Sequence, residues 1–367
     1  MRLANDRERE TMVMVVVKQE KRLLEATAVG KSERLRRPTI RDVATVAGVS
    51  RATVSRVING GHYVSGDKSA AVNEAIDRLR FSVNHTARNL ATRRTGSVAF
   101  VISEAQEGLF EDPNFGVLIT TCSMEVMRLE GHLVVMAAGE PSSQVHLANY
   151  LRAGHVDGAL LAPTFRDEPL LDGLAGGDLP IVSFGRPFRY EKEVSWVSVD
   201  DHAAVRQIIA YLTSRGHRSI ATITGPLNLS GGWWRLEGYR EALGPRFRES
   251  LVAYGDWSYE SGRVGARDLL ERHPELDAIF VASDLMAGGA ILELRRAGRR
   301  VPEDVAVAGF DDSKAAISTE PPLTTMRHPL AQLAREAVRM LFAMIDGQQD
   351  GPEHLMLPPE LIIRGSA

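Results

Sequence analysis

The sequence of 367 residues contains a single cysteine, Cys122. A single cysteine cannot form a disulfide within the chain, which is typical of proteins in a reducing compartment. The best candidate for a membrane segment is the apolar run at residues 12–17, far shorter than the roughly 20 residues that a membrane-spanning helix needs. Charged residues follow this run at once, so it also lacks the layout of a secretory signal peptide. We therefore expect a cytoplasmic protein with no membrane partner.

Catalytic and metal-binding signatures are also missing. The sequence has no G-x-S-x-G motif, no phosphate-binding Walker loop and no H-E-x-x-H motif. His217, His273 and His328 lie in different contexts, without the spacing of metal ligands. The adjacent carboxylates Asp311 and Asp312 could form a catalytic pair, but no nucleophile lies near them in the sequence, which favours a turn at a strand end. We expect a protein that is not an enzyme and that uses no cofactor and no metal.

Charge is present in both signs but is unevenly distributed. The net charge of the chain is −3, whereas residues 34–94 hold 12 Lys and Arg against 4 Asp and Glu, a net charge of +8. The rest of the chain therefore carries −11. A basic segment attached to an acidic body favours a nucleic-acid partner. A solvated polar face would show the same excess, so charge alone leaves both interpretations open.

The basic segment at residues 38–83 predicts three short helices. Thr39 and Asp42 form a capping pattern at the start of the first helix. Gly48, followed by the N-cap residue Ser50, marks a tight turn into the second helix. The predicted inner face of this unit comprises Val43, Ala44, Ala47, Val49, Val54, Val57, Val72, Ala75, Ile76 and Leu79. Two closely crossing helices with a third that completes a small core predict a helix-turn-helix.

The second helix of this unit leaves long donors and small side chains on its outer face. Such side chains suit base edges and phosphates in a major groove. A helical hairpin that binds nothing would share the fold, but caps, turn, core and exposed donors together favour DNA binding. The expected DNA contacts of this segment are Thr39, Ser50, Arg51, Ala52, Thr53, Ser55, Arg56, Asn59 and Tyr63.

Beyond residue 95, apolar β-rich runs alternate with helical stretches. The runs are residues 97–102, 132–136, 158–162, 180–184, 218–223, 277–282 and 304–310. This alternation predicts parallel sheets buried on both faces, and the number of runs predicts two α/β lobes. A ligand would bind between the lobes, at the carboxyl ends of their strands. Arg186, Asp284 and Asp311 follow strands directly, and the rings of Trp257 and Phe115 could stack on a sugar.

The run TIRDVATVAGVSRATVSRVIN at residues 39–59 resembles the N-terminal signature of the LacI/GalR family of bacterial transcription regulators. The resemblance extends over roughly residues 38–364 and includes the stretches WRLEGYR, VASDLMAGGA and PPLTTMRHP. It implies an N-terminal all-α helix-turn-helix headpiece and an α/β two-lobed core that is similar to periplasmic sugar-binding proteins. The implied function is transcriptional regulation, most often repression, with operator affinity controlled by a small-molecule effector that is a sugar or sugar derivative.

The same resemblance implies a role for the polar connector at residues 84–95. In the family this segment becomes a hinge helix in the minor groove of the operator, where a leucine wedges between base pairs. The matching DNA contacts are Asn84, Ala87, Arg88 and Leu90. A plain flexible linker is the alternative. Two headpieces on one operator imply a homodimer and a pseudo-palindromic double-stranded DNA site.

The effector contacts of the family also carry over by position. Together with the residues proposed above, the expected effector-binding set is Phe115, Arg186, Arg235, Trp257, Asp284 and Asp311. Many members have Asn where this chain has Ser283, so the identity of the ligand stays open. Trp233 and Trp234 are unusual, and they either reshape the pocket or belong to the core.

The sequence therefore predicts the following organisation. Residues 1–37 form a disordered tail, 38–83 the helix-turn-helix domain, 84–95 the hinge helix or linker, and 96–367 the effector-binding and dimerisation domain, with an N-lobe at about 96–198 and 327–343 and a C-lobe at about 199–326 and 344–367. Two other classes compete with a regulator: a sugar-binding transport component and a carbohydrate enzyme. The transport component would need a signal peptide and would have no use for Arg51 and Arg56.

Overall fold

The computed structural model describes residues 38–58, 64–81, 94–103, 113–162 and 165–367. The chain divides into two compact units, Met1–Arg88 and Asn89–Ala367. Within the described ranges, no helix is long and apolar enough to cross a membrane.

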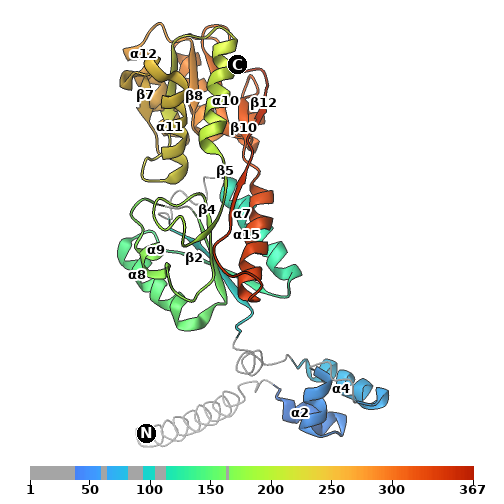
Figure 1. Ribbon diagram of the computed structural model, residues 1–367. Helices are drawn as coiled ribbons and strands as arrows, with labels where there is room; N and C mark the ends of the chain where they lie inside the picture. The colour runs from blue at the N-terminus through green and yellow to red at the C-terminus, as the bar shows by residue number, and fades with distance from the viewer. Residues whose placement is uncertain (1–37, 59–63, 82–93, 104–112, 163–164) are drawn as a thin grey trace, which may run out of the picture. The chain divides into compact units, whose positions relative to one another are not determined.

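The described residues of the first unit form three short helices, drawn in blue in Figure 1. They are α2 (Ile40–Ala47), α3 (Arg51–Ile58) and α4 (Gly66–Leu79). At the start of α2 the backbone N–H and the hydroxyl of Thr39 both donate to Asp42 Oδ2 at 2.7 Å. The helix ends at Gly48, which adopts a left-handed conformation with φ 64°. The hydroxyl of Ser50 accepts from the N–H of Thr53 at 3.1 Å and caps α3, so the predicted caps are confirmed.

A small core holds these three helices together. Its buried members are Val43, Ala44, Val54, Val72 and Ala75. Most other apolar side chains of the predicted inner face are partly buried against them, which confirms that face. The outer side of α3 leaves Arg51, Ala52 and Arg56 exposed.

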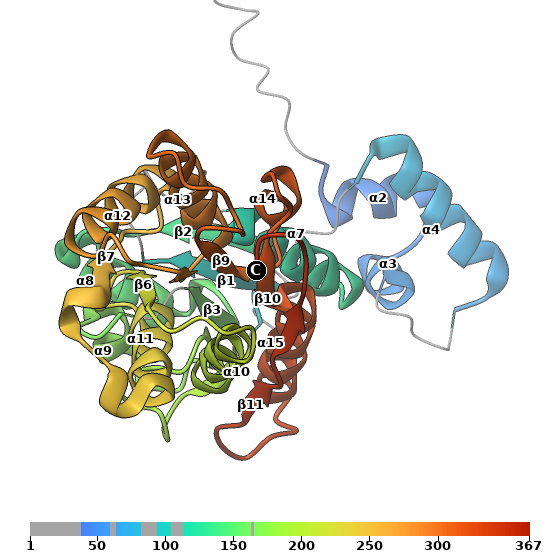
Figure 2. The same ribbon diagram turned by 90° about the horizontal axis from the view of Figure 1, so that it is seen from above.

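The second unit consists of two α/β lobes, each built on a six-stranded sheet (Figures 1 and 2). The elements of the N-lobe are β1 (Ser97–Ile102), α7 (Pro113–Arg128), β2 (His132–Ala137), α8 (Pro141–Tyr150), a π-helical turn (Leu151–His155), β3 (Gly158–Ala162), α9 (Pro169–Leu174), β4 (Ile181–Phe184), β5 (Ser195–Val199), α15 (Leu330–Ile345) and β11 (His354–Leu357). The strand order is β11-β5-β4-β3-β1-β2, and every pairing is parallel.

Strand β1 shows why this sheet needs helices on both faces. Phe100 and its neighbours two residues away pack against α7 and α15, whereas Ala99 and Val101 pack against α8 and α9. All residues of β1 after the first are buried, which explains why the strand reads as a continuous apolar run.

The C-lobe repeats this layered arrangement. Its elements are α10 (Asp201–Ser214), β6 (Ile220–Thr224), α11 (Ser230–Leu243), two 3₁₀ turns (Gly244–Arg246 and Glu249–Leu251), β7 (Val252–Tyr254), α12 (Tyr259–Arg272), β8 (Ala278–Val281), α13 (Asp284–Arg296), β9 (Ala306–Asp311), α14 (Lys314–Ser318), β10 (Thr324–Arg327) and β12 (Glu360–Ile362). The strand order is β12-β10-β9-β8-β6-β7, with only β12 antiparallel to its neighbour. The prediction of two α/β lobes with largely parallel sheets is confirmed.

The chain passes between the lobes three times, after β5, after β10 and after β11. The expected assignment of residues 344–367 to the C-lobe is therefore wrong for its first part. Helix α15 continues to Ile345, and β11 pairs in parallel with β5 of the N-lobe sheet. Strand β11 is a short, partly exposed edge strand, so it lacks the apolar run that predicts strands such as β1 and β3.

Candidate functional site

A cleft between the lobes lies at the carboxyl ends of both sheets. Its volume is about 1070 Å³ with its open mouth included. Phe115, Phe184 and Val197 line it from the N-lobe, and Arg235 and Trp257 line it from the C-lobe. A mostly apolar cleft with a few fixed polar groups is the usual form of a small-molecule site.

Arg235 is held in the cleft by several partners. Its Nε donates to Asp201 Oδ1 at 2.8 Å, and its Nη1 donates to the carbonyl of Ala282 at 2.6 Å. The guanidinium lies 3.6 Å from the ring centroid of Phe310, and only 6% of the residue is exposed. A buried guanidinium needs such partners, and they direct it toward the wall at Gly231.

Asp311 ends strand β9 on the same wall. Its Oδ1 lies 3.9 Å from Arg235 Nη1 and 3.7 Å from His328 Nδ1. The residue has φ 118° and is followed by Asp312 with φ 55°, a conformation that costs energy for residues other than glycine. Strain of this kind at a strand end is frequent in binding sites, where it aims a side chain.

Trp257 and Phe115 bring aromatic rings to the cleft from the two lobes. Trp257 lies between β7 and α12 with φ 73°, and its ring packs against Gly225. A Cβ at Gly225 would come within 2.1 Å of that ring, so this position requires glycine. Phe115 lies in the first turn of α7 and is 6% exposed. Rings on two sides of the cleft can cover the apolar faces of a ring-shaped ligand.

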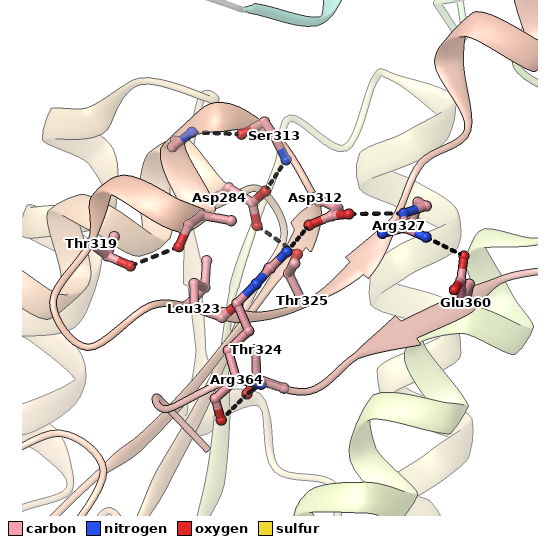
Figure 3. Close-up of polar contacts among 12 residues, drawn as sticks. Asp284, Asp312, Ser313, Thr319, Leu323, Thr324, Thr325, Arg327, Glu360 and Arg364 are labelled. Atoms are coloured by element: carbon pink, nitrogen blue, oxygen red, sulfur yellow. Dashed lines mark hydrogen bonds and ion pairs between the residues drawn. The ribbon is translucent and has the colours of Figure 1, made fainter.

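Asp284 does not line the cleft, although the sequence predicted that it would. It is 0% exposed and accepts from the backbone N–H of Ser313 at 2.7 Å and from the hydroxyl of Thr325 at 2.6 Å (Figure 3). Burial, and secondarily the charge of Asp311, raise the pKa of Asp284 above its usual value. Ser283 lies on the cleft wall instead, so the prediction that Asp284 contacts an effector directly does not fit its buried position.

Arg186 also lies outside this cleft. Its guanidinium pairs with Glu191 at 3.0 Å and lies 4.8 Å from the ring centroid of Trp234. Arg186 follows β4 as the sequence indicated, but Gly185 takes the place on the cleft wall. The predicted direct contact from Arg186 is corrected accordingly.

Sequence reasoning missed several residues of the cleft. Asp201 begins α10 and holds Arg235, and His328 lies on the crossing segment after β10. Asp201 lies where the chain passes from β5 to the C-lobe. The apolar runs do not predict β5 as a strand, so they give no sign of this passage. His328 lies in the PPLTTMRHP stretch, and the sequence around it carries no signal for a ligand contact. Among the described residues, no group of His, Cys, Asp and Glu could hold a metal ion.

A charged network lies at the end of β9 (Figure 3). Asp312 accepts from Arg327 Nε at 2.8 Å and also pairs with Arg364. Arg327 reaches Glu360 at 2.7 Å through its Nη1. The network joins the end of β9 to β10 and β12, the C-lobe strands next to two of the crossings.

The described residues that were predicted to contact DNA differ in exposure. Arg51, Ala52 and Arg56 are exposed along α3, and the hydroxyl of Ser50 caps that helix. The remaining described candidates, Thr39, Thr53 and Ser55, are partly buried. Asn59, Tyr63, Asn84, Ala87, Arg88 and Leu90 lie outside the described residues.

Comparisons with known proteins agree with this architecture. A family model described as bacterial regulatory proteins of the lacI family matches residues 39–84. A second model, a periplasmic binding protein-like domain, matches residues 209–367.

Relatives and solved structures cover nearly the whole chain. The HTH-type transcriptional regulator CelR of Thermobifida fusca is 44% identical over 91% of this chain and 99% of its own length. AscG of Escherichia coli is 32% identical over 86% of this chain and 94% of its own length. A CelR–cellobiose complex superimposes with a TM-score of 0.71 at 41% identity, covering 90% of this chain and 100% of that one. A lac repressor dimer bound to operator gives a TM-score of 0.80 at 25% identity, covering 90% and 99%. The chain therefore belongs to the LacI family and is a DNA-binding transcriptional regulator.

Proposed function

We propose that this regulator is a repressor that binds its operator as a homodimer and responds to a β-linked glucose disaccharide such as cellobiose. The solved CelR structure, at 41% identity, is a complex with cellobiose, which makes this disaccharide the first candidate. The effector would bind in the cleft between the two lobes. The protein would act in the cytoplasm, where its operator DNA lies.

The arrangement of Arg235 and Asp311 together with the aromatic rings of Trp257 and Phe115 carries this proposal. A sugar has a rim of hydroxyl groups and two less polar faces. The guanidinium of Arg235 and the carboxylate of Asp311 can each hold two hydroxyls, whereas Trp257 and Phe115 can cover the faces. Because Asp201 and the carbonyl of Ala282 already hold Arg235, its side chain loses little conformational freedom when the ligand binds.

A catalytic role for the same cleft fits the geometry less well. Hydrolysis of a glycosidic bond needs two carboxyl groups that flank the bond, one of them protonated. Both cleft carboxylates, Asp201 and Asp311, face Arg235, at 2.8 and 3.9 Å. Asp284 has a raised pKa, but it is 0% exposed and cannot reach a substrate in the cleft. We therefore propose binding without catalysis.

For DNA we propose that α3 reads the major groove. Arg51 and Arg56 are exposed on this helix and would reach base edges or phosphates, with Ala52 allowing close approach. Ser50, Thr53 and Ser55 would support backbone contacts. The connector at residues 84–95 would enter the minor groove, with Leu90 as the wedge.

A homodimer is supported by apolar side chains on the surface of the N-lobe. Met124 and Met127 on α7 are 67% and 68% exposed, and Val135 on the edge strand β2 is 46% exposed. Exposed apolar residues gathered on one helix and one edge strand suit a symmetric contact with a second copy. The lac repressor that resembles this chain is a dimer on its operator.

Effector and operator would be linked through the lobes. Arg235 is bonded to Asp201 directly after the first crossing, and His328 lies on the second crossing. A ligand that pulls on these residues changes the relative stability of two lobe arrangements. Such coupling is typically about 1–3 kcal/mol per site.

Two titrations test the proposal. Purified full-length protein is titrated with cellobiose, lactose and maltose by calorimetry, and its binding to DNA from upstream of its own gene is measured with and without each sugar. We expect cellobiose to bind at least about tenfold more tightly than maltose, the difference made by one well-placed hydrogen bond. Cellobiose should also reduce operator affinity, and that affinity should fall steeply with added salt. Equal binding of all three sugars, or no effect of cellobiose on the operator, would contradict the proposal.

A further inference from the structure

Trp233 and Trp234, at the start of α11, do not line the cleft. Both are partly buried, and each ring is covered by an arginine from the other lobe. These arginines are Arg166, which follows β3, and Arg186, which follows β4. The two tryptophans therefore contribute to contacts between the lobes.

Arg166 lies between two aromatic rings. Its guanidinium carbon is 4.2 Å from the ring centroid of Phe188 and 4.4 Å from that of Trp233. The two rings are 6.5 Å apart at an interplanar angle of 70°. Phe188 belongs to the N-lobe and Trp233 to the C-lobe. The guanidinium of Arg166 therefore contacts one ring from each lobe, and we call this region of contact between the lobes the seam.

The backbones of the two lobes also pair at this point. The N–H of Arg166 donates to the carbonyl of Asn228 at 2.8 Å, and Phe165 forms an antiparallel bridge with Leu229. Leu229 lines the cleft. The contact between the lobes thus continues directly into the wall of the binding site.

A second pair lies beside the first. The guanidinium of Arg186 stacks at 4.8 Å over the ring of Trp234 and is held by an ion pair with Glu191. The carbonyl of Glu191 in turn accepts from the indole N–H of Trp196 at 3.3 Å. Contacts within the N-lobe therefore hold Arg186 in position for its contact with Trp234 of the C-lobe.

Both sides of the seam are firmly attached to their lobes. On the C-lobe side, a Cβ at Gly232 would lie 2.2 Å from the carbonyl oxygen of Pro226, so this loop is folded tightly onto the start of α11. On the N-lobe side, the buried carboxylate of Glu168 accepts from the N–H of Phe165 at 3.2 Å and from the hydroxyl of Ser103 at 2.6 Å. Contacts between two fixed segments restrain the lobes themselves.

We propose that Arg166, Arg186, Trp233 and Trp234 form a latch. Their contacts stabilise the arrangement in which the two lobes touch along the seam, the closed arrangement, without a bound ligand. They are positioning residues for the effector response and do not touch the effector. This inference rests on the proposed function, because the effector is taken to bind in the cleft that the latch closes. A ligand that needs the closed arrangement binds more weakly when that arrangement is less populated.

The size of the effect follows from the contacts. Each partly exposed cation–π contact stabilises the closed arrangement by a factor of about 2 to 5. Trp233→Ala and Arg166→Ala should therefore each weaken cellobiose binding by about 2- to 5-fold, because each removes the same cation–π contact between the lobes. The double variant should lose little more than either single variant, because both changes remove the same contact. Arg166→Lys, which keeps the charge but not the planar group, should lie in between.

Amide hydrogen exchange of the full-length protein tests the latch directly. The peptide that contains the Arg166 N–H should exchange slowly in the wild-type protein without sugar, and faster in Trp233→Ala. Trp233→Leu keeps an apolar side chain and serves if the alanine variant does not fold. Arg215→Ala, at an exposed arginine directly after α10 of the C-lobe, is the control and should match the wild-type protein in both measurements.

The outcomes separate the latch from the function on which it rests. If the wild-type peptide exchanges as fast as that of the variants, the latch does not exist. If exchange differs but cellobiose affinity is unchanged, the contacts do not control the effector response and the inference is overturned. If no variant, and not even the wild-type protein, binds cellobiose, the proposed effector fails, while the exchange rates still decide whether the lobes are latched.

Discussion

Arg235 Nε donates to Asp201 Oδ1 at 2.8 Å, and this ion pair joins α11 to the first residue of α10. Asp201 follows directly on the first passage of the chain between the lobes. Both side chains are largely buried, at 7% and 11% exposure, so the pair is shielded from solvent screening. The group best placed to hold a ligand is thus bonded to a segment that links the lobes.

Arg235→Lys should weaken effector binding by about 30-fold or more, because removing a partner from a buried hydrogen-bonded charge pair costs about 2 kcal/mol or more. A lysine cannot bond Asp201 and the carbonyl of Ala282 with one fixed planar group. Calorimetric titration with cellobiose measures the loss. Arg240→Lys on the same helix, where the arginine pairs with Glu237 at 2.7 Å, is the matched control. Unchanged affinity in Arg235→Lys would remove the residue from the binding site.

Replacement by asparagine should affect effector affinity differently at Asp284 and at Asp311. Asp284→Asn can accept from the Ser313 N–H and donate to the Thr325 hydroxyl, so we expect effector affinity within about threefold of the wild-type value. Asp311→Asn removes a charge from the cleft and should lower that affinity by about tenfold, since charged hydrogen bonds are stronger than neutral ones. Titration of both variants under identical conditions measures the difference. A larger loss in Asp284→Asn than in Asp311→Asn would reverse the two roles.

Much of the fold was readable because buried parallel strands are apolar throughout. All seven apolar runs coincide with strands, namely β1, β2, β3, β4, β6, β8 and β9. The strands that were missed are short or carry polar residues, as in SWVSV of β5 and HLML of β11. Missing β11 also misplaced the last passage between the lobes. Short edge strands depend on their neighbours, and a local sequence pattern does not contain those neighbours.

The site was readable only in part, and for a related reason. Residues directly after strands were correctly expected near the carboxyl ends of the sheets, but the sequence does not tell which way a side chain points. Asp284 turns into the C-lobe to bond Thr325, and Arg186 turns toward Glu191 and Trp234. These directions are decided by partners far away in the sequence. The contact of Arg166 with Trp233 was unreadable for the same reason.

Arg56→Ala should lower operator affinity by about 5- to 150-fold, because a contact to a base edge is worth about 1–3 kcal/mol. Arg56 is exposed in the last turn of α3, so the fold of the headpiece should be kept. Fluorescence anisotropy with labelled operator measures the loss, and cellobiose titration of the same variant should match the wild-type protein. Arg78→Ala, in the last turn of α4, is the matched control. If both arginine variants lost affinity equally, charge alone would account for binding and the proposed orientation of α3 would be incorrect.

The ionisation of Glu168, in the N-lobe, can be followed through the pH dependence of the free energy of unfolding. The residue is 2% exposed, and burial raises its pKa from 4.5 to about 7, against the opposing effect of hydrogen bonds from Ser103 and Phe165. The folded chain therefore keeps this proton in a pH range where the unfolded chain has lost it. The contribution of Glu168 to the free energy of unfolding is greatest below its unfolded pKa and decreases as the pH rises to about 7.

Glu168→Gln should remove this decrease, because a glutamine has no charge to bury. Its amide oxygen can accept from the Phe165 N–H while its amide nitrogen donates to the Ser103 hydroxyl, so both hydrogen bonds are kept. Urea unfolding at about pH 5 and about pH 8 measures the effect, and the variant should gain stability over the wild-type protein at the higher pH only. Glu271→Gln, at an exposed position of α12, controls for the loss of a surface carboxylate. A stability difference between Glu168→Gln and the wild-type protein that did not change with pH would show that the carboxyl of Glu168 is ionised across this range.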